Sequence, residues 1–395
     1  MFLFAALLPP PLNAQTDTLP PTRKRLDLFP AISSAPETKL TLGVIGIAYL
    51  DFRKGDPYTP LSNVEFLTVY TLAKQVLVES RWEIFTHRRR WRTRGELLFQ
   101  KYPDRNYGIG NDASALVAEF KEGGSWDTLN YLNFNSNRIK CSPVVLRQIR
   151  PNLYAGIQGD VEYLYKYRVI PKAYAFVNAD SGAIQQVPVA GLRAGLGFQL
   201  LYDTRDYVLN PLKGSLVEVN TRHYGNWLGS DFTFNQYALE VRQYLNPAPN
   251  QTLALRGMLS LEDTPTGVPL RALSRVGGHK FIRGYFKGTY QDLHLLSFEA
   301  EYRLPFWKPE QNSKIWQIWK RLGVVGFFSG AQVFHAGQGI AFDRFNLAAG
   351  GGLRILLNKA SRLNIRIDYA VALSKNSGGP DKQQKGLYFF LGEAF

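Results

Sequence analysis

The feature that most constrains this chain is a two-residue hydropathy period carried through long segments. Residues 297–304 place apolar and aromatic side chains at even positions and Ser, Glu, Glu and Arg at odd positions. Segments 191–203, 252–262 and 362–373 alternate in the same way. Successive side chains of a β-strand point to opposite faces, so each segment predicts a strand with one apolar and one polar face. We therefore expect an all-β chain.

The length of these segments favours a membrane barrel over a soluble sandwich. Many hold ten or more residues, against a usual strand length of about 5–6 in globular proteins. A transmembrane strand needs only about 10 residues with every second one apolar, which agrees with the near-neutral mean hydropathy of −0.19. The chain has no run of 18 apolar residues, so a helical membrane protein is not expected. One cysteine excludes a disulfide framework.

The alternation and its interruptions predict a sixteen-stranded antiparallel transmembrane β-barrel. An even number of strands keeps both termini in the periplasm, with the short connections on the same side and the long connections outside. The expected strands are 39–52, 63–74, 76–87, 91–101, 113–122, 130–148, 151–168, 191–203, 215–225, 232–245, 251–262, 292–304, 322–334, 345–356, 362–373 and 385–395.

The segment before the barrel indicates export. Residues 1–14 combine an apolar run with small and turn residues, as in a signal peptide, although no basic n-region precedes them. A buried N-terminal segment is the alternative, but three consecutive prolines from Pro9 would break a core helix. We expect a signal peptide at 1–14, a short periplasmic lead-in at 15–38 and the barrel at 39–395.

The long connection before segment 292–304 carries the strongest motif, GGHKFIRGY from Gly277 to Tyr285. Its Ile282-Arg283-Gly284-Tyr285 resembles the sixth extracellular loop of the BamA/TamA-like superfamily of outer-membrane barrels, also called bacterial surface antigen proteins. Three further resemblances follow the family order: the segment from Tyr202 to Gly214, FEAEYRLP from Phe298 to Pro305, and the last strands around Ala348–Arg354 and Arg366–Tyr369. The resemblance implies a short member without POTRA domains and a sixth loop inserted into the lumen. The loop residues are Gly277, Gly278, Ile282, Arg283, Gly284 and Tyr285.

A lumen-inserted loop would bring Arg283 among inward-facing wall residues, where a charge must be paired. The resemblance implies Glu301 as its acidic partner, with Glu299 one lumen position away. A second family acid is replaced by Ser329. We therefore expect the loop to be held by Glu301, with help from Ser329. An ordinary hairpin with an exposed arginine is the alternative.

Other motifs are interpreted as structural. The family-like turn is expected to be periplasmic and to fix the chain locally, through Asp203, Arg205, Asp206, Pro211 and Gly214. The terminal aromatic Phe395 is expected to end the last strand, which must seal against the first.

The basic run near residue 90 is expected at an extracellular hairpin, where it would contact lipopolysaccharide phosphates or line the lumen. The residues are Arg88, Arg89, Arg90 and Arg92. We do not expect a nucleic-acid partner for an exported barrel. The five histidines have no metal-ligand spacing, and no nucleotide-binding or hydrolase motif occurs. We expect no enzyme activity, no cofactor and no metal.

The resemblance implies a role in inserting or translocating polypeptides, or other substrates, at the outer membrane of a Gram-negative bacterium. The expected partners are outer-membrane lipid, lipopolysaccharide, a client polypeptide and a separate periplasmic subunit. The alternatives are a gated or plugged passive pore, and a surface-exposed structural or adhesive barrel. The sequence does not identify the client polypeptide.

Overall fold

The computed structural model covers the chain in ranges that include most of the predicted strands. The described residues are 26–35, 39–52, 56, 59–72, 74–111, 117–121, 125–129, 131–170, 174–177, 184–185, 189–263, 267–278, 281–305, 321–358, 362–374 and 384–395. The predicted signal peptide at 1–14 lies outside them. Within these ranges no helix is long and apolar enough to cross a membrane.

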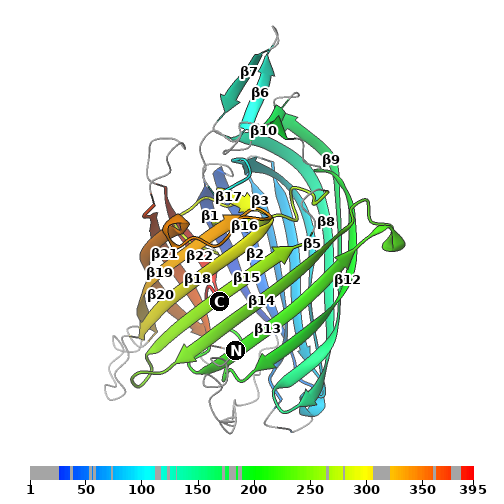
Figure 1. The fold of residues 1–395 in the computed structure, drawn as a ribbon. Helices are drawn as coiled ribbons and strands as arrows, with labels where there is room; N and C mark the ends of the chain where they lie inside the picture. Colours follow the sequence, from blue (N-terminus) through cyan, green and yellow to red (C-terminus); the bar gives the residue numbers. More distant parts are fainter. Residues whose placement is uncertain are drawn as a thin grey trace.

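One sixteen-stranded antiparallel sheet dominates the fold and curves into a barrel-shaped wall (Figure 1). Its strands are ordered as they follow in the chain. They are β1 (Leu26–Ala35), β2 (Lys39–Leu50), β3 (Ser62–Thr71), β4 (Val76–Phe85), β5 (Trp91–Asn106), β8 (Leu132–Arg150), β9 (Leu153–Ile170), β12 (Gly191–Asp203), β13 (Gly214–Tyr224), β14 (Phe234–Leu245), β15 (Thr252–Glu262), β18 (His294–Pro305), β19 (Leu322–Phe334), β20 (Asn346–Asn358), β21 (Leu363–Ala372) and β22 (Lys385–Leu391).

The number of strands in this sheet is as predicted, but one strand is misplaced. The sheet begins with β1, inside the segment expected as a periplasmic lead-in. The expected wall strand at 113–122 is instead the short β6 (Val117–Lys121). It belongs to a separate four-stranded sheet with β7 (Ser125–Leu129), β10 (Tyr174–Val177) and β11 (Ile184–Gln185).

The strands before residue 101 therefore run in the direction opposite to the predicted one. The sheet gains β1 at its start and lacks the expected strand 113–122, so the number of strands stays even. The hairpin between β4 and β5 consequently lies at the end of the barrel that holds the β8–β9 and β12–β13 turns. The register confirms this, because Trp91 lies opposite Arg147 and Tyr202 lies opposite Leu153. The basic run is therefore not at the end of the sixth loop, and its predicted extracellular position is wrong.

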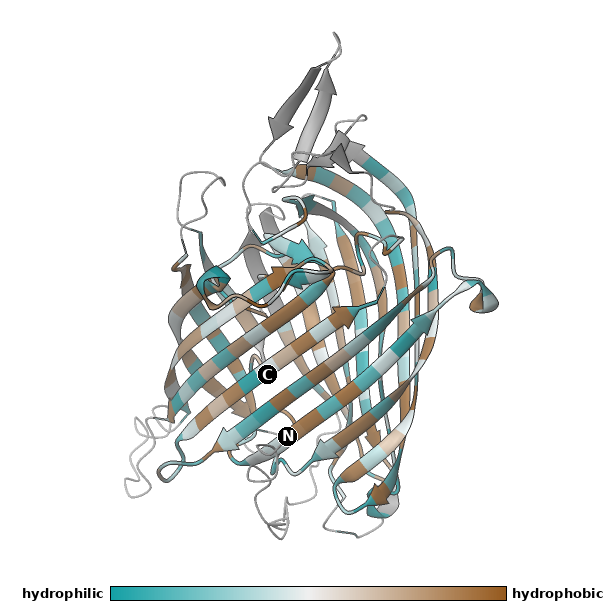
Figure 2. Cartoon of the chain, viewed as in Figure 1, coloured by the Kyte–Doolittle hydropathy of each residue, from teal (hydrophilic) through white to brown (hydrophobic). Residues whose placement is uncertain are grey.

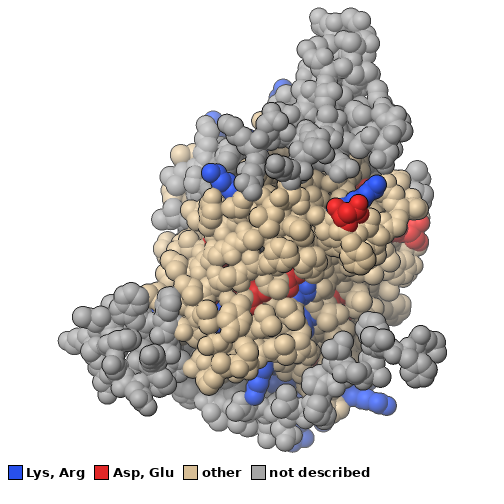
Figure 3. All heavy atoms as spheres, turned by 60° about the vertical axis from the view of Figure 1, so that its left-hand side comes forward, with Lys and Arg blue, Asp and Glu red and all other residues tan. Residues whose placement is uncertain are grey.

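The side chains are arranged as in a membrane barrel. Along β18, Glu299, Glu301 and Arg303 are buried, whereas Phe298 and Leu304 are exposed. Exposed apolar side chains recur on the outer faces of other strands, and the hydropathy alternates along the wall (Figure 2). In Figure 3 most of the described surface is uncharged; most visible Lys and Arg lie toward its ends, and a small group of acidic and basic side chains shows near its middle. A soluble fold would bury the apolar face, so this inversion identifies a transmembrane wall.

The two ends of the sheet approach each other. β1 pairs with β2, and β22 pairs with β21 over seven residues from Lys385 to Leu391. One apolar cluster contains Ile47 and Tyr49 of β2 together with Leu363 at the start of β21, with Phe29 of β1 packed against it. The two ends of the sheet, β1 with β2 and β21 with β22, therefore lie near each other.

Candidate functional site

The connection between β15 and β18 brings Arg283 against the inner face of the wall. The side chain is 1% exposed. Its Nη2 lies 2.7 Å from Oε2 of Glu301 on β18, and its Nη1 lies 2.6 Å from Oδ2 of Asp368 on β21. The guanidinium also sits over the ring of Phe327, 3.6 Å from the centroid. One arginine therefore connects the loop to three wall strands, β18, β19 and β21.

The backbone of the loop depends on glycine at its tight turn. Gly277 has φ +103°, and a Cβ there would lie 2.0 Å from the carbonyl oxygen of Phe286. The close approach lets Gly278 N donate to Tyr285 O at 3.0 Å. Tyr285 is fully buried, and its hydroxyl donates to Leu347 O on β20 at 2.9 Å. The motif residues thus fold the loop on itself and fasten it to the wall.

The predicted partners of Arg283 are only partly the observed ones. Glu301 forms the expected ion pair. Glu299 pairs instead with Arg256 on β15 at 3.3 Å, and the buried Ser329 Oγ has no hydrogen-bond partner among the described residues. Asp368 supplies the second carboxylate, which the sequence analysis missed. Its position on the polar face of segment 362–373 was the available signal.

Glu301 and Asp368 belong to a larger buried network. Arg303 Nε donates to Glu301 Oε1 at 2.7 Å, and Arg354 Nη1 donates to Asp368 Oδ1 at 2.5 Å. Burial by itself would lower the pKa of Arg283, but the carboxylates of Glu301, Glu299 and Asp368 raise it above its ordinary value. The loop arginine is therefore held in its charged form, and both carboxylates are bridged by more than one guanidinium.

The C-terminal tail also enters this network. β22 ends at Leu391, and Gly392 follows with φ +76°. Glu393 Oε2 then accepts from Arg354 Nε at 2.8 Å. Phe395 is 7% exposed, and the guanidinium of Arg303 lies 5.9 Å from its ring centroid. The prediction that Phe395 ends the closing strand is wrong, because the chain turns inward before that residue.

The loop contacts the last strand directly. Gly284 N donates to the hydroxyl of Tyr388 on β22 at 3.0 Å. Phe286 N donates to Oε1 of Gln384, just before β22, at 2.9 Å. These bonds join the sixth loop to the last strand. Buried ion pairs also join the loop to the inner face of the wall and to the C-terminal tail, through six residues that we call the loop–tail network (Arg283, Glu301, Arg303, Arg354, Asp368 and Glu393).

The predicted periplasmic turn is a compact unit between β12 and β13. Arg205 Nε and Nη2 each lie 2.9 Å from the Asp203 carboxylate. Asp206 Oδ1 accepts from Leu212 N at 2.9 Å, and Gly214 has φ +107°. Pro211 is buried within the same turn. These contacts fix the turn.

The basic run divides between the lumen and the rim. Arg92 is 2% exposed, and its Nη1 lies 2.9 Å from Asp203 Oδ2. Its Nη2 also pairs with Glu83 on β4. Arg92 cannot contact lipopolysaccharide because its guanidinium is buried inside the wall and paired with Glu83 and Asp203. Arg88 and Arg90 are exposed, at the opposite end of the barrel from the sixth loop.

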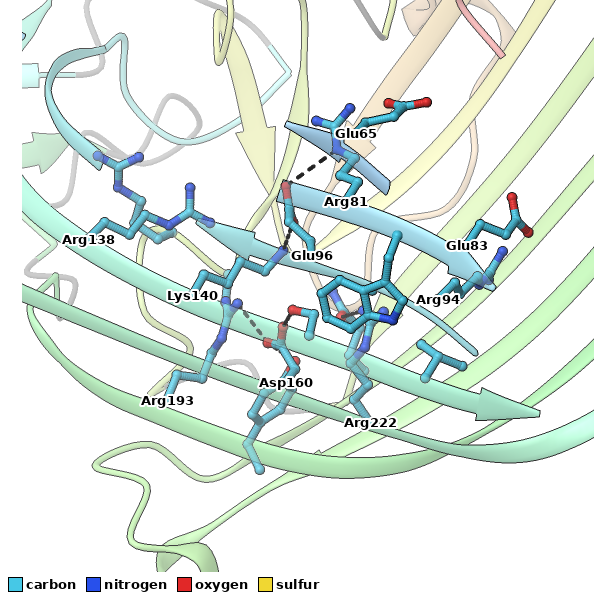
Figure 4. A pocket seen from close by; sticks show the side chains of 18 of the residues that line it. Glu65, Arg81, Glu83, Arg94, Glu96, Arg138, Lys140, Asp160, Arg193 and Arg222 are labelled. Carbon is cyan, nitrogen blue, oxygen red and sulfur yellow. Dashed lines mark hydrogen bonds and ion pairs between the residues drawn. The ribbon is translucent and has the colours of Figure 1, made fainter. Parts of the chain in front are cut away.

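The other half of the lumen holds a polar cavity of about 540 Å³ (Figure 4). Its walls come from β3, β4, β5, β8, β9, β12, β13 and β14, with Arg271 and Ala272 of the sixth loop on one side. Ion pairs cross between strands, for example Lys140 Nζ to Glu96 Oε2 at 2.8 Å and Arg193 Nη2 to Asp160 Oδ2 at 2.9 Å. The cavity is thus a hydrophilic space beside the loop–tail network.

An apolar outer face, a charged lumen and a loop fastened inside define an outer-membrane β-barrel. The family model of the Omp85 superfamily domain matches residues 93–395. The chain therefore belongs to the Omp85 superfamily, a family of outer-membrane insertion and translocation proteins.

Solved structures of the same fold are similar to this chain at low sequence identity. BamA from Haemophilus ducreyi lacking POTRA domains 1–3 aligns with a TM-score of 0.54 and 13% identity, over 93% of this chain and 70% of that chain. CdiB from Escherichia coli gives 0.58 and 7% identity, over 93% and 62%. CdiB from Acinetobacter baumannii gives 0.52 and 11% identity, over 92% and 59%. No curated protein sequence matches the chain.

Proposed function

We propose that this protein inserts or translocates polypeptides at the outer membrane by offering an unpaired strand edge at the meeting of β1 and β22. The observation that carries the proposal is the short last strand. β22 pairs with β21 over only seven residues, and the chain then leaves the wall at Gly392. Unpaired backbone groups at a strand edge can template an incoming strand by β-augmentation.

The loop–tail network gives this edge a means of control. Residues 384–395 contact the sixth loop through Tyr388 and Gln384, and the wall through Glu393. A client strand that displaced β22 would have to break these contacts. The network would therefore hold β22 in place until a client engages, and a separate periplasmic subunit would deliver that client.

Site-specific crosslinking tests the proposal. A photocrosslinking residue at Leu28 of β1 should form adducts with an unfolded outer-membrane polypeptide during assembly into proteoliposomes. Phe198 of β12 provides the matched control, because both side chains are exposed on the outer wall, at 57% and 67%. Adducts at Leu28 but not at Phe198 support the proposal. Equal labelling at both positions, or none at Leu28, would contradict it.

A plugged pore is the second candidate, favoured by the polar cavity beside the loop. The two functions differ in planar bilayers. A lumen obstructed by the loop–tail network should give small, flickering conductance. A large, stable and solute-selective conductance of the unmodified protein would support the pore and argue against the assembly proposal.

A further inference from the structure

The rim at the short-turn end of the barrel carries a group of exposed arginines whose role the proposed function leaves open. Arg90 lies in the β4–β5 hairpin, and its carbonyl oxygen accepts from Gln148 N on β8 at 2.9 Å. β8 ends two residues later at Arg150, and the β8–β9 turn follows. The two connections are therefore side by side. The exposed basic residues are Arg88, Arg90, Arg147 and Arg150, which we call the arginine rim.

At Arg147 the rim lies on the outer, membrane-facing side of the wall. Trp91 is paired in register with Arg147, and Arg92 is the adjacent residue that points into the lumen. The Arg147 guanidinium lies 5.8 Å from the Trp91 ring centroid. Trp91 and the nearby Ile149 are 46% and 55% exposed. This face combines an arginine, a tryptophan and an isoleucine on the outside of the wall.

Such a combination fits the interface between hydrocarbon and headgroups. A cation on the outer face of a barrel is costly at the bilayer midplane and much less so near the interface. Tryptophan is enriched at that same depth. Arg147 lies four residues from the β8–β9 turn, so its charged end can reach headgroup level.

The charge of the rim selects an anionic partner. Residues 86–92 and 147–152 contain no Asp or Glu. Guanidinium groups bind phosphate oxygens through paired hydrogen bonds, which favours them over ammonium groups for this contact. By the resemblance that places the sixth loop outside, the rim lies in the opposite, phospholipid leaflet.

We propose that the arginine rim is a binding site for anionic phospholipid headgroups in the periplasmic leaflet. The lipid phosphates bridge Arg88, Arg90 and Arg147, and Trp91 packs beside the glycerol region. The site anchors the β4–β5 and β8–β9 connections to the membrane surface. It replaces the lipopolysaccharide contact expected from the sequence.

Lipid retention in native mass spectrometry tests this site. The protein is folded into nanodiscs that contain equal parts of phosphatidylglycerol and phosphatidylcholine, and the lipids that remain bound after release are counted. The wild type should retain phosphatidylglycerol preferentially. The triple variant Arg88→Gln, Arg90→Gln, Arg147→Gln should lose this preference by on the order of a hundredfold, since each of the three cations near the surface attracts anionic lipid.

The matched control removes three exposed cations at the other end of the barrel, by Arg168→Gln, Arg344→Gln and Lys385→Gln. It should keep the preference, and both triple variants should show unchanged heat-modifiable migration on gels. A wild type that does not distinguish the two lipids would overturn the proposal. An equal loss in the control variant, or rim-dependent retention of lipopolysaccharide in preference to phosphatidylglycerol, would also overturn it.

Discussion

Removal of the Arg283 guanidinium should loosen the sixth loop and destabilise the barrel. The group is 1% exposed and bridges Glu301 and Asp368 at 2.7 and 2.6 Å. Breaking a buried ion pair by removing one partner costs about 3–5 kcal/mol. Glu301 keeps Arg303, and Asp368 keeps Arg354, so neither carboxylate is left unpaired. We therefore expect Arg283→Ala to lower the free energy of unfolding by about 3 kcal/mol, at the lower end of that range.

Urea unfolding of the protein in lipid vesicles measures this effect, with tryptophan fluorescence as the signal. Arg344→Ala is the control, because it removes an exposed arginine from another loop. A double-mutant cycle between Arg283→Gln and Asp368→Asn should give a coupling energy of about 1–3 kcal/mol, as for residues of one ion-pair network.

The reasoning would be refuted by an Arg283→Ala variant that unfolds at the urea concentration of the wild type. It would also be refuted by a coupling energy near zero, because Arg283 and Asp368 would then contribute to the free energy of unfolding independently of each other.

Three further predictions concern the tail, the loop and the wall. Phe395→Ala should lower the free energy of unfolding by about 3 kcal/mol, since it empties a buried site between two arginines; an unchanged urea midpoint would contradict the inward position of the tail. Gly277→Ala should cost at least about 2 kcal/mol because the position has φ +103°, whereas Gly339→Ala, with open space around its Cβ, should be neutral; equal midpoints of the two variants would refute this. Cys141 lies between the cavity-lining Lys140 and Ser142 and opposite the exposed Leu97, so it faces lipid. In vesicles it should react with a lipid-soluble maleimide and resist a membrane-impermeant one; rapid labelling by the impermeant reagent would place it in the lumen instead.

The sequence by itself determined that the chain forms long strands with one apolar and one polar face. A two-residue period over long segments fixes which side chains share a face, and the burial of side chains along β18 follows this period from Ser297 to Leu304. The motif from Gly277 to Tyr285 also identified the loop, because its glycines are needed for close backbone approach. These properties are local, so they can be read from neighbouring residues.

Only the tertiary structure decided which strands meet and what the loop binds. Segment 113–122 alternates like a wall strand, but pairing partners, not hydropathy, decide membership of the sheet, and β1 takes that place. The second acid for Arg283 comes from Asp368, 85 residues further along the chain, and the tail reaches Arg354 through Glu393. Contacts over such separations depend on the curvature and register of the whole barrel. The β4–β5 part of the arginine rim also lies at the opposite end of the barrel from the predicted one, because one misplaced strand reverses the direction of every strand before it.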